Sequence, residues 1–421
     1  MGSLEGGGTK GLRATDMTDT LKARDGKDIE EAVRWALANG KTLEVLGRGS
    51  KRVLGRPSQT DHTLDVSGLR GVTLYEPAEL VLSAKAGTPI AEIEKLVADK
   101  NQQLAFEPMD YGVLLDGAEA DGTLGGALAA NLAGPRRIKA GAARDHFLGV
   151  TAISGRGETF KSGGRVVKNV TGYDLCKLLA GSYGTLAVMT DVTIKTLPAA
   201  ETQETVVVFG LDDVHASAAM TLAMNSSCDV SAAAHLPGHI AYRFDGLSAK
   251  NAATVFRLEG VAPSVKHRKE ALCDLLKPFG KIDAIDEGTS VTLWRSIRDA
   301  RPFSAEGPSH ERPVWRVSTA PGKGHEIVNQ IPSSAEMFYD WAGGLIWIAP
   351  LPTADGGAGP IRAAVKALGG HATLVRAPAA LRASVEVFQP QDAGLAALSK
   401  RVKDSFDPSG VLNPGRMWAG V

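Results

Sequence analysis

The sequence of residues 121–134 reads Asp-Gly-Thr-Leu-Gly-Gly-Ala-Leu-Ala-Ala-Asn-Leu-Ala-Gly, and its small side chains say most about the architecture. It lies within residues 112–189, which hold 15 glycines where the overall rate of 48 in 421 predicts about nine. Such an excess indicates backbone held close to a ligand, and turns in a loop-rich β region are the alternative. A helix starting near Leu124 would aim free N–H groups at a ligand, whereas close helix packing would use the same glycines and alanines.

A second glycine-containing loop, Gly47-Arg48-Gly49-Ser50-Lys51, follows a predicted strand at 42–46. Glycines let successive N–H groups point at one spot and form an anion nest, and Ser50, Arg48 or Lys51 would add donors for a phosphate. The Walker pattern is absent. The Rossmann pattern also fails, because Arg52 stands where its third glycine is required.

Two further segments carry glycines at 163–175 and 181–190. The later one reads Gly-Ser-Tyr-Gly-Thr-Leu-Ala-Val-Met-Thr and predicts a turn feeding a strand whose backbone lies along a flat ligand.

Composition restricts the class of protein. A length of 421 residues predicts two or three domains, and 47 basic residues balance 47 acidic ones, which argues against a general grip on nucleic acid or anionic membrane. No apolar run approaches the roughly 18 to 20 residues of a membrane span. The scattered Cys176, Cys228 and Cys273 disfavour a disulfide framework, a zinc ribbon or a self-contained iron–sulfur site. We therefore expect an enzyme or enzyme subunit of a reducing compartment.

The chain divides into four predicted parts. Residues 1–19 form a Gly-rich disordered extension, 20–200 a first domain, 201–395 a second α+β domain, and 396–421 a turn-rich segment that packs onto the first domain. The first helix is expected to be capped by Asp28 and ended by Gly40.

In the second domain, strands are predicted at 206–209, 239–244, 314–318, 345–349 and 373–376. Helices are predicted there at 214–224, 266–276, 292–299 and 361–368. Trp341 and Trp347 flank a predicted hairpin and are expected in the core.

The order of these segments carries a resemblance. Five segments follow one another in this order: Gly-Arg-Gly-Ser-Lys, Thr-Leu-Gly-Gly-Ala-Leu-Ala-Ala-Asn-Leu-Ala-Gly, Lys-Asn-Val-Thr-Gly-Tyr-Asp-Leu at 168–175, Gly-Thr-Leu-Ala-Val-Met-Thr, and Asp-Pro-Ser-Gly-Val-Leu-Asn-Pro-Gly-Arg at 407–416. Together they resemble the vanillyl-alcohol-oxidase or PCMH type of FAD-linked oxidases. Within that type the chain most resembles the FAD-binding subunits of bacterial glycolate oxidases. The resemblance implies an α+β fold with a two-lobed PCMH-type FAD-binding domain and an α+β cap domain.

It also implies a set of FAD-binding residues that surround the pyrophosphate, the ribityl chain and the flavin edge. These are Gly47, Arg48, Gly49, Ser50, Lys51, Thr123, Leu124, Gly125, Gly126, Asn131, Gly134, Gly141, Arg144, Asp145, Gly184, Thr185, Val188 and Asn413. Relatives with covalent flavin use His or Cys beside the cofactor. The phosphate loop has no His, so FAD is expected to be non-covalent, with His62 and Cys176 as the alternative attachment points.

One departure concerns catalysis. The catalytic 2-hydroxy-acid dehydrogenases of this family, including the partner subunit, share a His-x-Gly-Asp-Gly-Asn-x-His segment, and the nearest fragment here, residues 369–373, lacks its acidic residue and second His. Cap arginines Arg295, Arg298 and Arg316 are candidates to bind a substrate carboxylate, with an ordinary amphipathic helix or core packing as the alternative. Tyr173 beside Asp174 is a candidate acid–base pair or a buried, hydrogen-bonded tyrosine.

Other polar groups have plainer interpretations. A metal site is not expected, because Pro237 and Gly238 break the helix that would align His235 with His239. Arg136 and Arg137 read as a solvated turn, or as a contact for a partner subunit.

Two functions follow from the resemblance. The first is an FAD-binding subunit of a glycolate oxidase complex that oxidises a small 2-hydroxy acid such as glycolate by hydride transfer to flavin, with electrons leaving through a second FAD-linked subunit and an iron–sulfur subunit. The second is a non-catalytic FAD-binding scaffold or electron relay of the same complex. Either would be cytoplasmic, or peripheral to the inner membrane through the complex.

Overall fold

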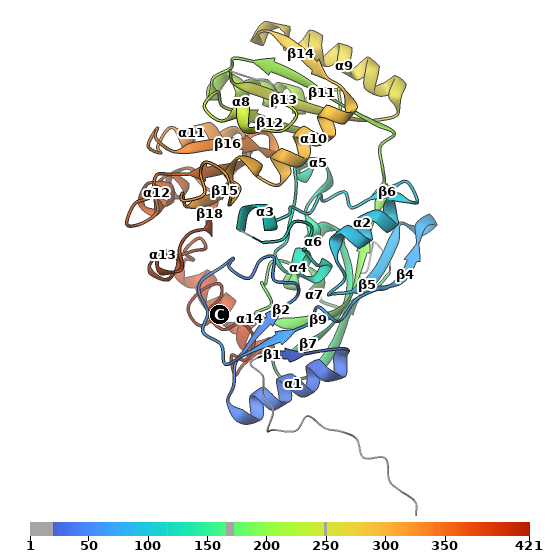
Figure 1. Cartoon of the computed structure of the whole chain (residues 1–421), viewed down its shortest axis with the longest axis vertical. Helices are drawn as coiled ribbons and strands as arrows, with labels where there is room; N and C mark the ends of the chain where they lie inside the picture. Colours follow the sequence, from blue (N-terminus) through green and yellow to red (C-terminus); the bar gives the residue numbers. More distant parts are fainter. Residues whose placement is uncertain (1–19, 116, 166–171, 248–250) are drawn as a thin grey trace, which may run out of the picture.

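The computed structural model describes residues 20–115, 117–165, 172–247 and 251–421, and the chain is α+β, with four sheets among the described residues. Residues 1–19, predicted to be a disordered extension, and Lys168–Thr171 of the quoted motif lie outside the described residues. Two smaller sheets occupy one end of the molecule and an eight-stranded sheet the other (Figure 1).

The first lobe is a three-stranded parallel sheet covered by one helix. Its strand order is β1-β3-β2, with β1 (Thr20–Lys22), β2 (Leu43–Leu46), β3 (His62–Asp65) and helix α1 (Gly26–Asn39). Gly40 ends α1 in a left-handed conformation, as predicted. The predicted cap is wrong: Asp25, not Asp28, accepts the N–H groups of Lys27 and Asp28. Asp28 instead forms an ion pair with Arg24 one turn away.

The second lobe is a five-stranded antiparallel sheet in the order β4-β5-β9-β7-β8. Its strands are β4 (Val72–Glu76), β5 (Val81–Lys85), β7 (Phe147–Ser154), β8 (Thr159–Gly163) and β9 (Ala187–Lys195). Short helices accompany it: α2 (Ile90–Ala98), α3 (Gly112–Leu115), α4 (Leu124–Ala129), α5 (Arg137–Ala140), α6 (Ala143–His146), α7 (Leu175–Leu179) and the 3-10 turn η1 (Pro77–Glu79). A two-stranded pair joins β6 (Gln102–Gln103) to β10 (Leu197–Pro198).

The cap is built on an eight-stranded antiparallel sheet in the order β14-β11-β13-β12-β16-β17-β15-β18. Its strands are β11 (Thr202–Phe209), β12 (Ala232–Leu236), β13 (Ala253–Gly260), β14 (Ile282–Ile285), β15 (Val314–Ser318), β16 (Glu336–Asp340), β17 (Leu345–Ala349) and β18 (His371–Arg376). Its helices are α8 (Asp213–Met224), α9 (Ala262–Leu276), α10 (Glu287–Arg298), α11 (Gly324–Val328), α12 (Ala358–Leu368) and α13 (Ala379–Ser384). Short 3-10 turns complete it: η2 (Ala241–Arg243), η3 (Lys277–Phe279), η4 (Arg301–Phe303), η5 (Pro321–Lys323) and η6 (Trp341–Gly343).

Most predicted cap elements are confirmed, and β15 and β17 have the predicted bounds. The strand predicted at 239–244 is wrong, because a 3-10 turn at Ala241–Arg243 occupies this stretch after Pro237. His239 lies outside any strand there, and its Nε2 accepts the N–H of Met337. Trp341 and Trp347 are core residues as predicted, with exposed fractions of 6% and 1%.

The chain returns to the first lobe at its C-terminus. Helix α14 (Ala393–Phe406) leads to a segment in which Leu412 bridges to Leu43 of β2, so the first and last parts of the chain lie side by side (Figure 1). The buried ammonium of Lys403 pairs with Asp407 at 2.7 Å and donates to the carbonyl oxygens of Thr185 and Leu412. This network ties the turn-rich tail to helix α14 and to the turn before β9.

One apolar core joins the cap to the first domain. Met109, Tyr111 and Leu132 from the first domain pack in the same buried cluster as Trp294 and Phe338 from the cap. The cap therefore packs on the first domain in part through apolar contacts, while the predicted boundaries at 200 and 395 stay predictions.

Candidate functional site

A cleft runs between the two lobes and holds about 740 Å³ of empty space, part of it open to solvent. This size lies within the roughly 300–1,000 Å³ typical of small-molecule and cofactor sites. Ten of the eighteen predicted cofactor residues line it: Gly47, Arg48, Gly49, Ser50, Lys51, Thr123, Gly125, Gly126, Gly184 and Val188. Three loops far apart in sequence thus meet at one place.

The loop after β2 offers a row of unused donors. No backbone N–H from Gly47 to Lys51 donates a hydrogen bond to any described residue, although all five residues line the cleft. Gly49 adopts a positive φ of 85°, which favours glycine and lets the chain turn around a central point. A turning loop with free N–H groups is what the predicted anion nest requires, and anion binding by this loop stays a prediction.

Cationic side chains complete this end of the cleft. Arg48 forms an ion pair with Asp121, but Lys51 and Arg416 have no carboxylate partner among the described residues. Burial lowers the pKa of Lys51 to about 8 and also lowers the pKa of Arg416. Both groups would gain from an anion placed in the cleft.

The N-terminus of helix α4 behaves differently from the prediction. The N–H groups of Leu124 and Gly125 donate to the carbonyl oxygens of Thr88 and Ala86, and that of Gly126 donates to the Thr123 hydroxyl. The expectation of free N–H groups aimed at a ligand is therefore wrong here. The glycines serve close approach instead, since a Cβ on Gly125 would lie 2.9 Å from the backbone oxygen of Ala86 and one on Gly47 would lie 2.9 Å from Oγ1 of Thr123.

Two further hollows adjoin the cleft. One shares Lys51 and Thr123 with it and is also lined by Glu94, Asp110 and Arg298. The other lies where the first domain meets the cap, shares Ala130 and Tyr183 with the cleft, and is also lined by Tyr111, Asn131 and Arg316.

Arg316 is the predicted cap arginine that lines the hollow between the first domain and the cap, next to the cleft. Its guanidinium makes no hydrogen bond or ion pair with a described residue, and it lies over the ring of Trp341, 4.8 Å from the centroid. The hydroxyls of Tyr111 and Tyr183 likewise have no hydrogen-bond partner among the described residues. Burial raises the pKa of both tyrosines, so both stay protonated at neutral pH.

Of the other predicted catalytic residues, Arg298 lines the first adjoining hollow, and Arg295 and Tyr173 line neither the cleft nor the two hollows. Arg298 is paired with Asp299 at 2.8 Å, and Arg295 is exposed on α10. Tyr173 is 91% exposed and lines no cavity of the described structure, so the expectation of a buried tyrosine is wrong. Its neighbour Asp174 caps helix α7 through the N–H of Lys177.

Eight predicted cofactor residues lie outside the cleft, and their contacts are structural. Leu124 is fully buried, and the Asn131 side chain accepts the N–H of Arg144. The Asp145 carboxylate closes a turn with Ala142 and sits against Gly141. The remaining three are Gly134, Thr185 and Asn413.

Asn413 connects two segments that line the cleft and does not line the cleft itself. Its side-chain oxygen accepts the N–H of Val45 and its amide nitrogen donates to the carbonyl of Tyr183. It therefore ties together two of the loops that line the cleft, and a direct contact with the cofactor stays a prediction.

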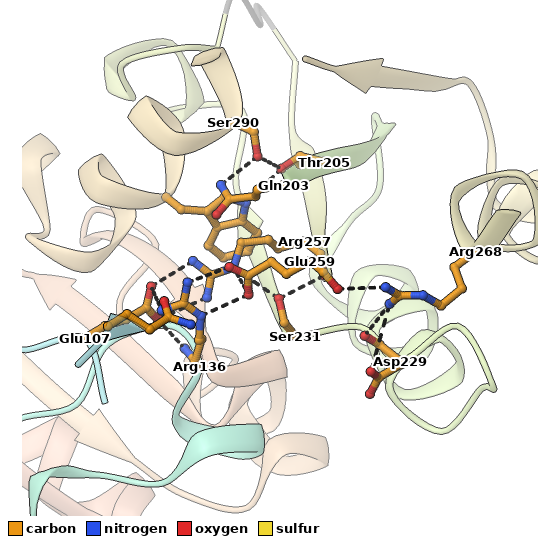
Figure 2. Close-up of polar contacts among 12 residues, drawn as sticks. Glu107, Arg136, Gln203, Thr205, Asp229, Ser231, Arg257, Glu259, Arg268 and Ser290 are labelled. Carbon is orange, nitrogen blue, oxygen red and sulfur yellow. Dashed lines mark hydrogen bonds and ion pairs between the residues drawn. The ribbon is translucent and has the colours of Figure 1, made fainter. Parts of the chain in front are cut away.

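A buried ion cluster joins the two domains beside this site (Figure 2). Arg257 of β13 is 1% exposed and pairs with Glu107 at 2.8 Å, while Arg136 pairs with both Glu107 and Glu259. Burial opposes ionisation of Glu259, but the two arginines outweigh it and lower its pKa to about 2. The interpretation of Arg136 as part of a solvated turn is therefore wrong, because its partners come from segments that sequence alone does not place nearby.

The alternative attachment points for flavin are remote. His62 packs edge-on against Trp35, and Cys176 is fully buried, where burial raises its pKa to about 12. Neither residue lines the cleft, and non-covalent binding of FAD stays a prediction.

Several lining residues escaped sequence reasoning: Val45, Leu46, Arg52, Val66, Ala86, Ala129, Ala130, Tyr183, Met189 and Arg416. Arg416 stood in the quoted closing motif, and Tyr183 stood beside Gly184. Both could have been found from their place within recognised motifs, as could Ala129, Ala130 and Met189. Val45, Leu46, Val66 and Ala86 are apolar residues outside those motifs and carry no such signal.

The comparisons with known proteins agree with this geometry. Residues 20–163 match the FAD binding domain family. The 4-ethylphenol oxidase from Gulosibacter chungangensis, solved with isoeugenol, has a TM-score of 0.67 at 14% identity and covers 95% of this chain and 89% of its own. Fold, cleft and family together define an FAD-linked oxidoreductase with a PCMH-type FAD-binding domain and a cap.

Sequence relatives give the narrower family. Glycolate oxidase subunit GlcE of Escherichia coli strain K12 is 33% identical, covering 92% of this chain and 96% of its own length. Glycolate oxidase subunit GlcD of Bacillus subtilis strain 168 is 26% identical, covering 70% of this chain and 68% of its own. The chain belongs to the family of FAD-linked oxidase subunits represented by GlcE.

Proposed function

We propose that this chain is the FAD-binding subunit of a complex that oxidises a small 2-hydroxy acid such as glycolate to the 2-oxo acid and passes the electrons to a partner subunit. The observation that carries the proposal is Arg316, a half-buried guanidinium without a carboxylate partner among the described residues, in a hollow that shares a wall with the cofactor cleft. A guanidinium fork binds a carboxylate in two-point fashion.

The cofactor cleft fits FAD. Unused N–H groups of Gly47–Lys51 and the charges of Lys51 and Arg416 would hold the pyrophosphate, and the small residues Gly125, Gly126 and Ala129 leave room for a flat ring system. FAD, when bound, supplies the acceptor for the hydride from the substrate carbon, and the hydroxyl proton would be released to the solvent to which the cleft is open.

The hollow beside the cleft would hold the substrate. Arg316 would orient the carboxylate, and the protonated hydroxyls of Tyr111 and Tyr183 would donate hydrogen bonds to the substrate's oxygen atoms. Binding at two ends fixes the orientation of a two- or three-carbon acid. Such orientation is the main requirement for hydride transfer from a bound substrate to a bound flavin.

Anaerobic addition of glycolate to the purified FAD-loaded chain tests the proposal. We expect the flavin absorbance near 450 nm to bleach, and Arg316→Met to abolish bleaching while FAD stays bound. Arg295→Met is the matched control, because Arg295 lies on the exposed side of α10 and lines none of the hollows. An unchanged wild-type spectrum with glycolate and with longer 2-hydroxy acids would contradict the proposal.

The second candidate is a non-catalytic FAD-binding scaffold or electron relay. It is favoured by one observation: among the described residues that line the cleft and its two hollows, none is a histidine. A wild-type flavin that accepts electrons from the partner subunit but never from a 2-hydroxy acid would support this function.

The cysteines bear on where an iron–sulfur relay would be located in the complex. Cys176, Cys228 and Cys273 are separate free thiols, so an iron–sulfur relay would belong to another chain, and a second FAD-linked subunit would complete the complex. Among the described residues no helix is long and apolar enough to cross a membrane. We place the complex in the cytoplasm, with attachment to the inner membrane through a partner as the variant.

A further inference from the structure

We propose that Trp341 is a positioning residue that orients Arg316 for the substrate carboxylate and does so through its contact with the FAD-binding domain. This inference rests on the proposed function, because it assigns Arg316 an anionic ligand. Trp341 itself lines none of the three hollows, so its role would be exerted through Arg316.

Trp341 faces both domains at once. It belongs to the cap turn after β16, yet its indole Nε1 donates to the carbonyl oxygen of Gly134 in the FAD-binding domain, 2.9 Å away. The guanidinium of Arg316 lies over the same indole, with Cζ 4.8 Å from the ring centroid. A cation over an aromatic face is attracted to it, so the plane of the ring dictates where the guanidinium rests.

Arg316 has no other orienting partner among the described residues. Neither a hydrogen bond nor an ion pair links its side chain to any of them, whereas Arg298 in the neighbouring hollow is fixed by Asp299. The ring of Trp341 is therefore the contact that holds the Arg316 head group near the hollow, and the Gly134 carbonyl is the contact that holds the ring.

The Trp341 turn is held in an uncommon conformation. Trp341 and Ala342 have positive φ angles of 52° and 55°, a region that residues with side chains seldom adopt. The Asp340 carboxylate accepts the backbone N–H of Trp341 at 2.7 Å and fixes the start of this turn. Backbone outliers of this kind persist where the surrounding structure determines them, often beside functional sites.

The segment that carries the Gly134 carbonyl, which accepts the hydrogen bond from the Trp341 indole, is also held in place by its neighbours. A Cβ on Gly134 would lie 2.5 Å from the Cβ of Glu107, and the Glu107 carboxylate accepts the N–H of Arg136 at 2.7 Å. Glu107 is in turn paired with Arg257 of the cap (Figure 2). The cap thus grips the segment around Gly134 at two points, and seating of the cap is coupled to the orientation of Arg316.

Trp315 provides a matched control. It is a buried cap tryptophan whose Nε1 also donates to a glycine carbonyl, that of Gly356, and whose ring also carries an arginine, Arg362, at 5.0 Å. These contacts stay within the cap and line none of the three hollows. Trp315 precedes Arg316 in β15, but successive side chains of a strand point to opposite faces of the sheet, so Trp315→Phe removes the same kind of bond without removing a side-chain contact of Arg316.

The experiment uses the FAD-loaded chain and oxalate, a two-carbon acid without an oxidisable hydroxyl, and follows its binding through the flavin absorbance. We expect Trp341→Phe to raise the Kd for oxalate about fivefold to tenfold with FAD content unchanged. The double variant with Arg316→Met should bind no more weakly than Arg316→Met alone, since the two residues act on one interaction. Trp315→Phe should leave the Kd unchanged.

A further variant tests the inference even where Trp341→Phe does not fold. Arg316→Lys keeps the charge but loses the flat group that stacks on the indole, so we expect it to raise the Kd for oxalate as Trp341→Phe does; a wild-type Kd in Arg316→Lys would overturn the inference. Independent, additive effects of Trp341→Phe and Arg316→Met would overturn it as well while leaving the proposed function intact. If the wild type neither binds oxalate nor is reduced by 2-hydroxy acids, the proposed function fails, and this inference fails with it.

Discussion

The guanidinium of Arg416 donates a hydrogen bond to the carbonyl oxygen of Lys51 at 2.9 Å, across 365 positions of sequence. The backbone of Arg416 contacts the same loop, since its carbonyl oxygen accepts the N–H of Arg56 and would lie 2.9 Å from a Cβ on Gly55. The end of the chain therefore stabilises the loop that contains Gly47–Lys51, and Arg416 also lines the cleft.

Replacing Arg416 with Met is predicted to weaken FAD binding by at least about tenfold, because it removes a hydrogen bond to the loop and, on the proposed function, a charge that would face the pyrophosphate. Titration of the apoprotein with FAD, followed by quenching of flavin fluorescence, measures the change. Arg401→Met is the control, since Arg401 is exposed on α14 and lines no cleft. Equal affinities in the two variants would exclude this role for Arg416.

Lys51 predicts how FAD binding depends on pH. Burial lowers its pKa to about 8, so the ammonium form predominates below pH 8 and is lost above it, while a bound pyrophosphate would stabilise the charge. The affinity for FAD should be constant from pH 6 to 7 and fall as the pH rises through 8 toward 10. Lys51→Met should bind FAD more weakly at pH 6 and show a flatter profile, and a wild-type profile that stays level to pH 10 would contradict the assignment.

The sequence-based predictions succeeded where a function is encoded locally. Gly47 and Gly49 form one closely spaced pair of glycines, and Gly125 and Gly126 form another. The backbone at both pairs lines the cleft. Predictions were weaker where contacts join distant segments. Glu107 and Arg257 are 150 positions apart, and nothing in either neighbourhood indicates that they meet.

Two further features were not predicted from the sequence, a strand and a helix cap, and each has a physical cause. Strand β12 contains Ala232-Ala233-Ala234, residues of high helix propensity, and becomes a strand because β13 and β16 pair with it on either side. Asp25 and Asp28 both precede the helical pattern of α1, and only the backbone geometry at Asp25 selects it as the cap. Pairing with neighbouring strands decided the first case, and local backbone geometry decided the second.

Removing the cation at the centre of the interdomain ion cluster should be costly. Arg257→Met leaves Glu107 and Glu259 in a buried site with Arg136 as their remaining partner in the cluster, so we expect a loss of about 3–5 kcal/mol, seen as a lower melting temperature. Arg243→Met, which breaks a two-point pair with Glu336 inside the cap, is the control and should cost less because that pair is more exposed. A Trp341 environment that is unchanged in near-UV circular dichroism of Arg257→Met would argue against coupling of the cluster to the cap turn.

The same cluster predicts an acid limit to stability. The pKa of Glu259 in the folded chain is about 2, below the value of about 4.3 in an unfolded chain, so its contribution is present above about pH 4.5 and is lost as the pH falls toward 2. The difference in melting temperature between wild type and Glu259→Gln should therefore shrink as the pH is lowered from 5 to 3. A difference that is constant over this range would contradict the ionised state of Glu259.

Gly134 was predicted to face the cofactor, and the structure gives it a packing role. A methyl group at this position would collide with the Cβ and backbone oxygen of Glu107, at 2.5 and 2.6 Å. Gly134→Ala should lose about 1–3 kcal/mol of stability, or roughly 2–4 °C in melting temperature per kcal/mol, and weaken seating of the cap. Gly322→Ala, where a Cβ meets nothing within 4 Å, should have a melting temperature close to that of the wild type.

The raised pKa of Asp340 predicts that stability depends on pH in the sense opposite to that given by Glu259. It is 2% exposed, and burial raises its pKa to about 7, with the N–H of Trp341 as its hydrogen-bond donor. Because the folded-state pKa lies above the unfolded value, the protonated form favours the fold, and stability declines as the pH rises from about 4 to 7. Asp340→Asn keeps an oxygen for the Trp341 N–H and carries no charge, so its melting temperature relative to wild type should rise by about 2 °C or more between pH 5 and pH 8. If that difference is the same at both pH values, Asp340 ionises normally and the turn that carries Trp341 is held without regard to its charge.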